Sequence, residues 1–408
     1  MCGIVGRVNF IGGDINQTDL LNAVNQIESR GPDSVGLWSE NGCGLAHRRL
    51  SIIDLTESGN QPMISSDGRY VCVFNGEIYN YKEIRNLLGN SIRWKGNSDT
   101  EVLVEAWSRW GTKVLDKIDG MFAFTIWDKN LRKLYAARDR IGEKPFYYHW
   151  DGKTFIFASR PSPIFILNKD ISKDYDEQSL RYFLESGYVP APYSAHKGLK
   201  KLEPAKYITV DRNGLEINKY WDSTIIETEF DWQKRSENDL LDELDEIISL
   251  SVKKRMVSDV PLGAFLSGGI DSSLIVAMMA KHSAQTIKTF TIGFKEKEYD
   301  ESCQSRLVAE NIGTEHFTEM LNVDDLLDLM PDFLKNYDEP FFDSSAFPTM
   351  AVSRLAKQHV TVSLTGDGGD ELFGGYHYYK IAKILNPFFN SPDWFRSLLS
   401  STINKIPT

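Results

Sequence analysis

The first six residues, Met1-Cys2-Gly3-Ile4-Val5-Gly6, decide how the N-terminal half is interpreted. If the initiator methionine is removed, Cys2 carries a thiol and a free α-amino group on the same residue. An α-amine has a pKa of about 7.7–8.0, so it can take the thiol proton at neutral pH without a second base. This is the chemistry of an N-terminal nucleophile. The alternative is a cysteine that merely lies near a chain end.

Around this hexapeptide, as far as about residue 213, the sequence predicts short strands and a few helices. The segment Asp99–Trp110 has apolar residues at i, i+3 and i+4, which predicts an amphipathic helix with Ser98 or Asp99 as its N-cap. The pair Asn75-Gly76 is interpreted as a turn at the end of a strand. Alternating or β-rich apolar runs predict strands over Tyr70–Phe74, Met121–Trp127, Leu134–Ala137 and Thr154–Ala158. This half is therefore expected to be α+β.

Further motifs follow in chain order: Arg30-Gly31-Pro32-Asp33, His47-Arg48-Arg49-Leu50-Ser51, Asn75-Gly76-Glu77-Ile78-Tyr79-Asn80 and Ser98-Asp99-Thr100-Glu101. Together with the N-terminal hexapeptide they resemble the glutaminase domain of the asparagine synthetase family, a class II glutamine amidotransferase. The resemblance implies an N-terminal nucleophile hydrolase fold, an αββα sandwich, over residues 2–213. Ser29 and Asn97 stand where the family pattern has His and Gly. We expect glutamine recognition to survive both changes.

The resemblance also implies the catalytic groups of this domain. Cys2 would attack the side-chain amide of glutamine, and Asn75 with the backbone N–H of Gly76 would form the oxyanion hole. The residue chemistry agrees, because amide cleavage needs hydrogen-bond donors aimed at the developing oxyanion. The alternative for Asn75-Gly76 is a plain hairpin turn.

Recognition of the substrate's backbone charges is implied in the same way. Arg49 would hold the carboxylate of glutamine, and Glu77 and Asp99 would hold its α-ammonium group. A free amino acid carries both charges, so an arginine and one or two carboxylates suit it. Asp99 could instead cap the helix, and the two roles are compatible. The rest of the pocket wall would consist of Leu50, Ser51, Ile52 and Ile53.

The second half begins after a segment, residues 214–236, that we interpret as a linker because it has little periodicity. The apolar face of the helix predicted over Glu237–Met256 is expected to belong to a core. Beyond it, strands alternate with helices, which predicts an α/β domain with a parallel sheet over residues 237–408. The strands are predicted over Pro261–Leu266, Thr289–Phe294 and Val360–Leu364, and the helices over Ser272–Lys281 and Arg306–Asn311.

The loop Ser267-Gly268-Gly269-Ile270-Asp271-Ser272-Ser273 lies between a predicted strand and a predicted helix. A glycine-rich turn that opens a helix exposes N–H groups suited to phosphate. The loop resembles the pyrophosphate loop of ATP pyrophosphatases, and the alternative is an ordinary helix N-cap made of small residues. By the resemblance, ATP would be bound by Leu266, Ser267, Gly268, Gly269, Asp271, Ser272, Ser273, Ile292, Thr365 and Gly366.

A second glycine-rich segment, Leu364–Tyr376, is also acidic. Magnesium usually takes one or two carboxylates plus substrate oxygens, which makes Mg²⁺ the expected ion. By family position, Asp271 and Asp370 would hold the metal–pyrophosphate and Asp367 would lie at the reacting centre. Many family members have Glu where this chain has Asp367, so the acceptor could sit differently. The alternative is an acidic turn that binds nothing.

One more acidic segment, Asp338-Glu339-Pro340, resembles family segments on the acceptor side. A loop rich in turn residues would have the same composition, so this interpretation stays open.

The resemblance as a whole predicts a glutamine-dependent, ATP-consuming amidotransferase. Ammonia released at Cys2 would pass internally to a carboxylate that ATP·Mg²⁺ has activated as an acyl-adenylate, most simply turning aspartate into asparagine. Three alternatives are kept: a sugar carboxylate as acceptor, a non-catalytic nucleotide-binding relative and a tRNA-modifying pyrophosphatase. The expected partners are glutamine, ATP and the carboxylate acceptor, without nucleic acid or membrane, and a homodimer is left open.

Composition agrees with these expectations. The 408 residues carry a net charge of −11, which argues against a surface that binds nucleic-acid phosphates. No apolar run approaches the roughly 18 residues of a transmembrane helix, and no signal-peptide pattern is present, so the cytoplasm is the expected compartment. Without Cys-x-x-Cys spacing, neither a zinc site nor a disulfide framework is predicted. Because family synthetase domains continue well past Tyr376, we expect the second domain to be incomplete at its C-terminus.

Overall fold

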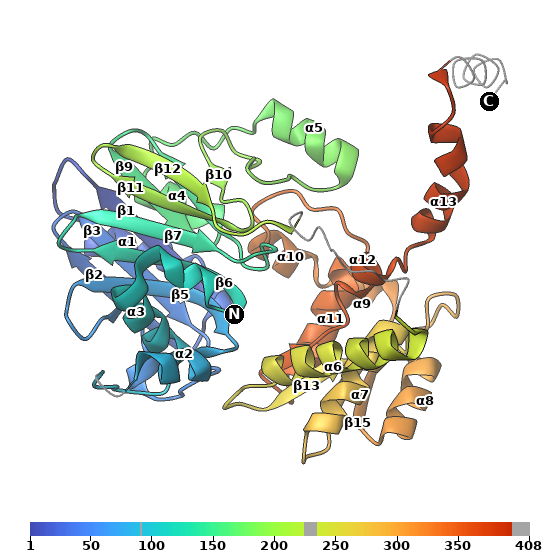
Figure 1. Ribbon diagram of the computed structural model, residues 1–408. Coiled ribbons are helices and arrows are strands. Elements are labelled where there is room, and N and C mark those ends of the chain that lie inside the picture. The colour runs from blue at the N-terminus through green and yellow to red at the C-terminus, as the bar shows by residue number, and fades with distance from the viewer. Residues whose placement is uncertain (90–91, 224–234, 394–408) are drawn as a thin grey trace. The chain divides into compact units, whose positions relative to one another are not determined.

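The computed structural model describes residues 1–89, 92–223 and 235–393 (Figure 1). The chain divides into two compact units. The first consists of residues Met1–Leu262 together with Leu321–Val362, and the second consists of Gly263–Met320 together with the residues from Ser363 onward. Each unit is described by itself.

Two six-stranded antiparallel sheets form the centre of the first unit. The first sheet has the strand order β10-β8-β9-β1-β3-β2 and the second has the order β12-β11-β7-β6-β5-β4. Strands of the first sheet are β1 (Gly3–Asn9), β2 (Ser34–Glu40), β3 (Cys43–Arg49), β8 (Tyr147–Trp150), β9 (Thr154–Ala158) and β10 (Lys200–Lys201). Strands of the second sheet are β4 (Met63–Ile64), β5 (Tyr70–Ile78), β6 (Gly120–Asp128), β7 (Lys133–Arg138), β11 (Lys206–Asp211) and β12 (Gly214–Lys219).

Helices cover the outer face of each sheet. Side chains alternate across a strand, so Val71 and Val73 of β5 lie in the core between the sheets while Cys72 and Phe74 lie in the core on the helix side. The result is four layers, helix–sheet–sheet–helix, and the predicted αββα sandwich is confirmed. The covering helices are α1 (Gln17–Asn25) and α4 (Pro161–Leu167) on the first sheet and α2 (Tyr81–Leu88) and α3 (Asp99–Trp110) on the second.

The interpretation of Asn75-Gly76 as a turn is wrong. Strand β5 continues through both residues, and Asn75 and Gly76 pair with Ala123 and Phe122 of β6. A Cβ atom at Gly76 would overlap the carbonyl oxygen of Met121, so glycine is needed here because two backbones lie close together. Since the pair lies inside a ladder, the hairpin-turn alternative is excluded.

The segment predicted as a linker contains regular structure. Its first residues form β12, which pairs with β11 along the edge of the second sheet. The local sequence has little apolar alternation because an edge strand needs only one neighbour and has exposed positions. Residues 224–234 of the predicted linker lie outside the described residues.

Helix α6 (Glu237–Arg255) confirms the helix predicted over Glu237–Met256, with Met256 as its C-cap. Its apolar face is only partly a core face. Val252 is buried, whereas Leu241 and Ile247 are 54% and 58% exposed. A helical period of apolar residues indicates that one face of the helix is suited to packing, but it does not show which residues pack against that face.

The second unit contains the predicted strand–helix alternation. Strands β13 (Leu262–Phe265) and β14 (Lys288–Phe294) pair in parallel, and α7 (Ile270–His282) makes the crossover that parallel strands require. They belong to a four-stranded sheet of order β15-β14-β13-β16, with β15 at Glu315–Leu321 and β16 at Val362–Leu364. The prediction of a parallel α/β fold here is confirmed.

The remaining helices are divided between the two units. They are α5 (Glu177–Ser186), α9 (Val323–Leu327), α10 (Met330–Asn336) and α11 (Ala346–Lys357) in the first unit, and α8 (Ser302–Ile312), α12 (Gly369–Phe373) and α13 (His377–Phe389) in the second. Among the described residues, none of these helices combines the length and the apolar character needed to cross a lipid bilayer.

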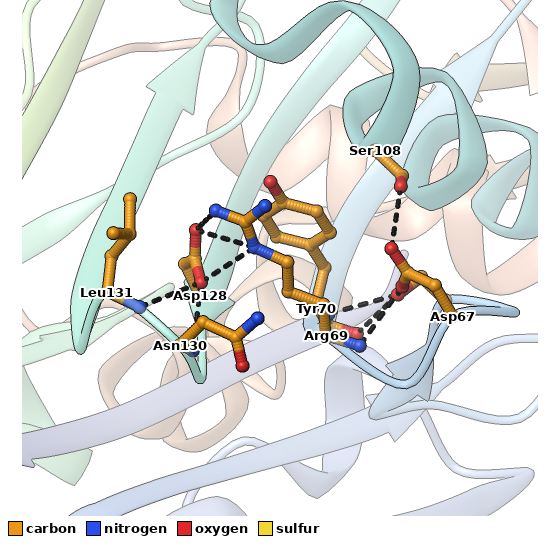
Figure 2. A network of polar contacts seen from close by, with 8 residues as sticks. Asp67, Arg69, Tyr70, Ser108, Asp128, Asn130 and Leu131 are labelled. Carbon is orange, nitrogen blue, oxygen red and sulfur yellow. Dashed lines mark hydrogen bonds and ion pairs between the residues drawn. The ribbon is translucent and has the colours of Figure 1, made fainter.

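A polar network ties the start of β5 to the end of β6 (Figure 2). The Arg69 guanidinium donates to both oxygens of the Asp128 carboxylate, with Nη2 2.6 Å from Oδ2 and Nε 3.0 Å from Oδ1. The same carboxylate accepts the backbone N–H groups of Asn130 and Leu131, and its side chain is only 1% exposed. This carboxylate therefore depends on Arg69 for its neutralising charge.

We expect Arg69→Met to lower the free energy of unfolding by about 1–2 kcal/mol, because it leaves a buried carboxylate with only backbone donors. Urea unfolding followed by circular dichroism measures the loss. Arg212→Met is the matched control, because Arg212 is an exposed residue for which no ion pair is seen in the described part of the chain. Equal stability of the two variants would contradict the assigned role.

Candidate active site

A pocket in the first unit brings together the N-terminus, the end of β3, the end of β5 and the start of α3. All the residues predicted for glutamine line it except Ser51, whose backbone N–H instead donates to Asp33 Oδ2 at 2.7 Å. Pocket residues that the sequence motifs did not assign are Gly59, Gln61, Phe74, Met121 and Lys144. Gly59, Gln61 and Lys144 lie outside all of the predicted segments, and Phe74 and Met121 were predicted only as the end and the start of strands.

Cys2 lies just before β1, and β1 pairs with β3. Its Sγ is 3.4 Å from the backbone N of Leu50, which donates, and its carbonyl oxygen accepts from Arg30 Nε at 3.0 Å. Burial raises the pKa of the Cys2 thiol, although the Leu50 backbone opposes this. The thiol therefore needs a base close by before it can react. The terminal amine of this chain is that of Met1, and burial lowers its pKa to about 6. An amine buried at this end of the chain therefore loses its proton more readily than a solvated one.

Asn75 has the strongest signature of a binding group. Its side chain is 1% exposed, and both amide atoms, Nδ2 and Oδ1, lack a hydrogen-bond partner within the described ranges. An unsatisfied buried amide costs roughly 1–3 kcal/mol, so proteins rarely leave one without a purpose. Because Asn75 and Gly76 line the same pocket as Cys2, the arrangement fits donors that wait for a substrate oxygen.

The Arg49 guanidinium is also buried in this wall, but much of it is already engaged. Nη1 donates to the Thr56 carbonyl at 2.8 Å and to Asn60 Oδ1 at 3.0 Å. Nη2 donates to the carbonyls of Ile53, at 3.4 Å, and Asp54. Arg49 therefore organises the loop 53–60, and its predicted contact with a substrate carboxylate would use Nε or replace one of these acceptors. That contact stays a prediction.

Glu77 and Asp99 place two buried carboxyl groups in the pocket. Asp99 Oδ2 accepts the backbone N–H of Ile78 at 3.0 Å, and burial raises its pKa to about 6. Burial, and then the neighbouring Asp99, raises the pKa of Glu77 to about 7. The N-cap of α3 is Ser98, whose Oγ accepts the N–H of Glu101 at 3.1 Å, so Asp99 is not the cap.

In the second unit, the loop 267–273 is held by its own hydroxyl groups. The Oγ atoms of Ser267 and Ser272 are 2.9 Å apart, and the N–H of Gly269 donates to Ser267 Oγ at 3.2 Å. Gly268 has a φ of +83°, and a Cβ there would lie 2.7 Å from the backbone N of Ser305. The loop is thus a built feature at the N-terminus of α7, and the N-cap residue Gly269 offers no side chain to occupy the exposed N–H groups.

The two glycine-rich segments of this unit pack against each other. A Cβ at Gly366 would lie 2.8 Å from the backbone N of Ser272, and one at Gly369 would lie 2.5 Å from Asp271 Cγ. Because Gly366 and Gly369 have no side chains, the segment that carries Asp370 can pack directly against Asp271. Asp367 is exposed, and its N–H donates to Thr365 Oγ1 at 3.4 Å.

The other residues predicted for ATP lie on the strands that lead into these segments. The Leu266 backbone bonds to Phe290 of β14, and Ile292 is half-buried on that same strand. Within the described ranges, no group of three or more potential metal ligands occurs. Mg²⁺ does not need such a group, because it commonly takes one or two carboxylates and completes its shell with phosphate oxygens and water. Asp271, together with Asp370 in the segment that packs against it, would supply one or two such carboxylates.

The carboxylates of Asp338 and Glu339 belong to the first unit and are both engaged. Glu339 accepts from Ser194 Oγ and the Ala195 N–H, each at 2.6 Å, and from Lys201 Nζ at 2.5 Å. Asp338 pairs with Arg160. Side chains used in this way are not free to bind an acceptor, so the turn-like alternative for this segment is favoured.

The glutamine amidotransferase domain family matches residues 1–221, and the asparagine synthase family matches residues 243–405. The chain belongs to the glutamine-hydrolysing asparagine synthetase family. The family boundary at residue 221 includes β12, consistent with the place of that strand in the second sheet.

Individual relatives cover nearly the whole chain. Glutamine-hydrolysing asparagine synthetase 1 of Bacillus subtilis is 37% identical over 403 residues, which are 98% of this chain and 62% of the relative. A second relative is a Methanocaldococcus jannaschii protein whose name provisionally assigns it as glutamine-hydrolysing asparagine synthetase 2. It is 37% identical over 399 residues, which are 92% of this chain and 76% of the relative. This chain thus spans less than two thirds of the length of the Bacillus relative.

A similar solved structure is the glutamine phosphoribosylpyrophosphate amidotransferase of B. subtilis in complex with ADP and GMP. It has a TM-score of 0.41 and 13% sequence identity, and the match covers 86% of this chain and 96% of that chain.

The buried carboxyl group of Glu77 predicts a pH dependence of stability. Its raised pKa means that the folded chain keeps a proton that the unfolded chain releases, so this contribution is present below about pH 4.5 and is lost as the pH rises through about 7. Between pH 5 and pH 8 we expect the free energy of unfolding to fall by about 1–2 kcal/mol more in the unmodified protein than in Glu77→Gln.

Urea unfolding at both pH values measures this difference. Glu83→Gln, at an exposed position on α2, is the control and should follow the unmodified protein. Parallel pH dependence of Glu77→Gln and the unmodified protein would show that Glu77 does not titrate in this way.

Proposed function

We propose that this chain hydrolyses glutamine at Cys2 and uses the released ammonia in an ATP-dependent amidation. The observation that carries the proposal is the buried, unpartnered amide of Asn75, in one pocket with Cys2, Arg49, Glu77 and Asp99. These groups are the nucleophile, the oxyanion donor and the opposite charges that a free amino acid with an amide side chain requires. Family membership supports the same reaction.

The glutaminase step follows from the chemistry of these groups. After removal of Met1, the α-amine of Cys2 takes the thiol proton and the thiolate attacks the amide carbon of glutamine. The oxyanion accepts hydrogen bonds from Asn75 Nδ2 and the Gly76 N–H. The α-ammonium then returns the proton to the leaving group, which departs as ammonia and leaves a thioester. Water, deprotonated by the same amine, releases glutamate and regenerates the thiol.

The second step is assigned to the second unit. The loop 267–273 offers N–H groups at the start of α7 for ATP phosphates, and Asp271 and Asp370 would hold Mg²⁺, which neutralises the phosphate charge when bound. The acceptor carboxylate attacks the α-phosphorus and releases pyrophosphate. Ammonia then displaces AMP and forms the amide. The names of the relatives support aspartate as the acceptor.

We expect Cys2→Ala to abolish ammonia release from glutamine, and Asn75→Ala to lower kcat by about 10²–10³-fold, as expected for the loss of one oxyanion donor. Glutamate formation by the purified chain measures both. The matched controls are Cys303→Ala, which removes an exposed thiol, and Asn130→Ala, which removes an exposed amide on a turn. Full activity of Cys2→Ala would refute the assignment.

The acceptor is tested separately, with ammonium chloride in place of glutamine. We expect AMP to form with aspartate and ATP·Mg²⁺, and Asp271→Asn to lower the rate at least tenfold, because a carboxylate that faces the metal–phosphate is lost. AMP formation with a uronic acid and none with aspartate would replace the acceptor assignment. Formation with neither would remove the synthetase step from this chain.

A further inference from the structure

The glutaminase pocket contains a buried cation that the proposed mechanism does not use. Lys144 is 5% exposed and lines the pocket together with Cys2 and Glu77. Its Nζ contacts Met1 Sδ at 3.1 Å, and no carboxylate of the described residues lies within ion-pair distance. Burying an unpaired ammonium group is costly, so its retention at this position calls for a purpose.

The position of Lys144 is built by its neighbours. The carboxylate of Asp139 accepts the N–H groups of Lys144, at 3.0 Å, and of Gly142, at 2.6 Å. Arg138 Nε donates to the Lys144 carbonyl at 2.7 Å. These bonds close the loop after β7 on both sides of the lysine, so its ammonium group is directed at the chain terminus by a rigid turn.

The charges around the terminus favour a role for this cation. Arg30 is bonded to the Cys2 carbonyl, and Lys144 contacts Met1. The carboxyl groups that act on this space are Glu77, Asp99 and Glu143, and burial raises the pKa of each, to about 7 for Glu77 and about 6 for Asp99. Burial also lowers the pKa of Lys144, and the charge of Glu143 opposes this. Arg49, the remaining cation of the pocket, is engaged by the carbonyls of its loop.

We propose that Lys144 is a positioning residue that keeps the α-amine of Cys2 unprotonated at neutral pH, so that this amine can accept the thiol proton. The inference rests on the proposed glutaminase function. A nearby positive charge disfavours a second one. Removal of Met1 takes away the hydrogen-bond acceptor of Lys144 Nζ seen among the described residues and places the new amine on the adjacent residue. The proton passes from Sγ to the amine and later to the departing ammonia, so no other reactant is required.

The experiment titrates the amine directly, because Lys144 also faces Glu77 and a rate profile alone would combine both groups. The chain, shown by mass spectrometry to begin at Cys2, is treated with cyanate from pH 5 to pH 9, and carbamylation of the N-terminal peptide is quantified. We expect Lys144→Met to move the midpoint of the profile upward by about one pH unit, and Lys144→Arg to keep it in place.

The acidic limb of kcat/KM for glutamine should move in the same direction in Lys144→Met and return with Lys144→Arg. Lys144→Gln provides a second neutral variant if Lys144→Met fails to fold. An unchanged carbamylation profile in a folded neutral variant overturns the inference, whatever happens to the rate. Failure of the proposed function is distinct, since it would appear in the unmodified protein as retained Met1 or as no ammonia from glutamine.

Discussion

The pairing of β5 with β6 is the constraint on which the proposed glutaminase site depends. The register Asn75↔Ala123 and Gly76↔Phe122 continues a ladder whose earlier residues, Val71 and Val73, fill the core between the two sheets. By the period of two, Asn75 and Glu77 continue the face of these valines. The layer between the sheets thus changes from apolar to polar along a single strand, and the pocket begins where the valines end.

This placement explains why the site is electrostatically unusual. A carboxyl group, an amide and an ammonium group at the end of a core layer are all poorly solvated, so each lies in an unfavourable state in the empty pocket. The proposed substrate, a zwitterion with an amide, would supply the missing partners. The pocket groups therefore lower the stability of the fold in return for binding capacity. Contacts elsewhere in the sheet, such as the Arg69–Asp128 pair, hold the strands in register.

The sequence predicts some parts of this structure well because their causes are local. Helix α3 has the predicted bounds, since its apolar period and its Ser98 cap lie within one short segment. Asn75-Gly76 misleads for the converse reason: the pair has the local signature of a turn, and only the distant backbone of β6 shows why glycine is there. The exposure of Leu241 on α6 likewise depends on distant residues.

The site residues also divide into those that the local sequence indicates and those that depend on distant parts of the chain. Motif order indicated the pocket residues Cys2, Asn75, Glu77 and Asp99, because a family resemblance carries their combination. It could not indicate Lys144, which reaches the pocket through a loop that the Asp139 carboxylate shapes. Nor could it show that the Arg49 guanidinium donates to carbonyls of its own loop, because every residue has a backbone carbonyl and the sequence does not show which ones accept a hydrogen bond.

The engagement of Asp338 and Glu339 has a consequence for how the chain is made. Their partners, among them Arg160 and Ser194, lie 178 and 145 residues earlier. Lys201 and Arg160 therefore lack their counter-ions until Glu339 has left the ribosome. At about 5–20 residues per second this delay amounts to roughly 7–36 seconds, during which the amidotransferase half is synthesised but not yet complete in its contacts. The N-terminal half therefore completes these contacts only after the segment that carries Asp338 and Glu339 has been synthesised.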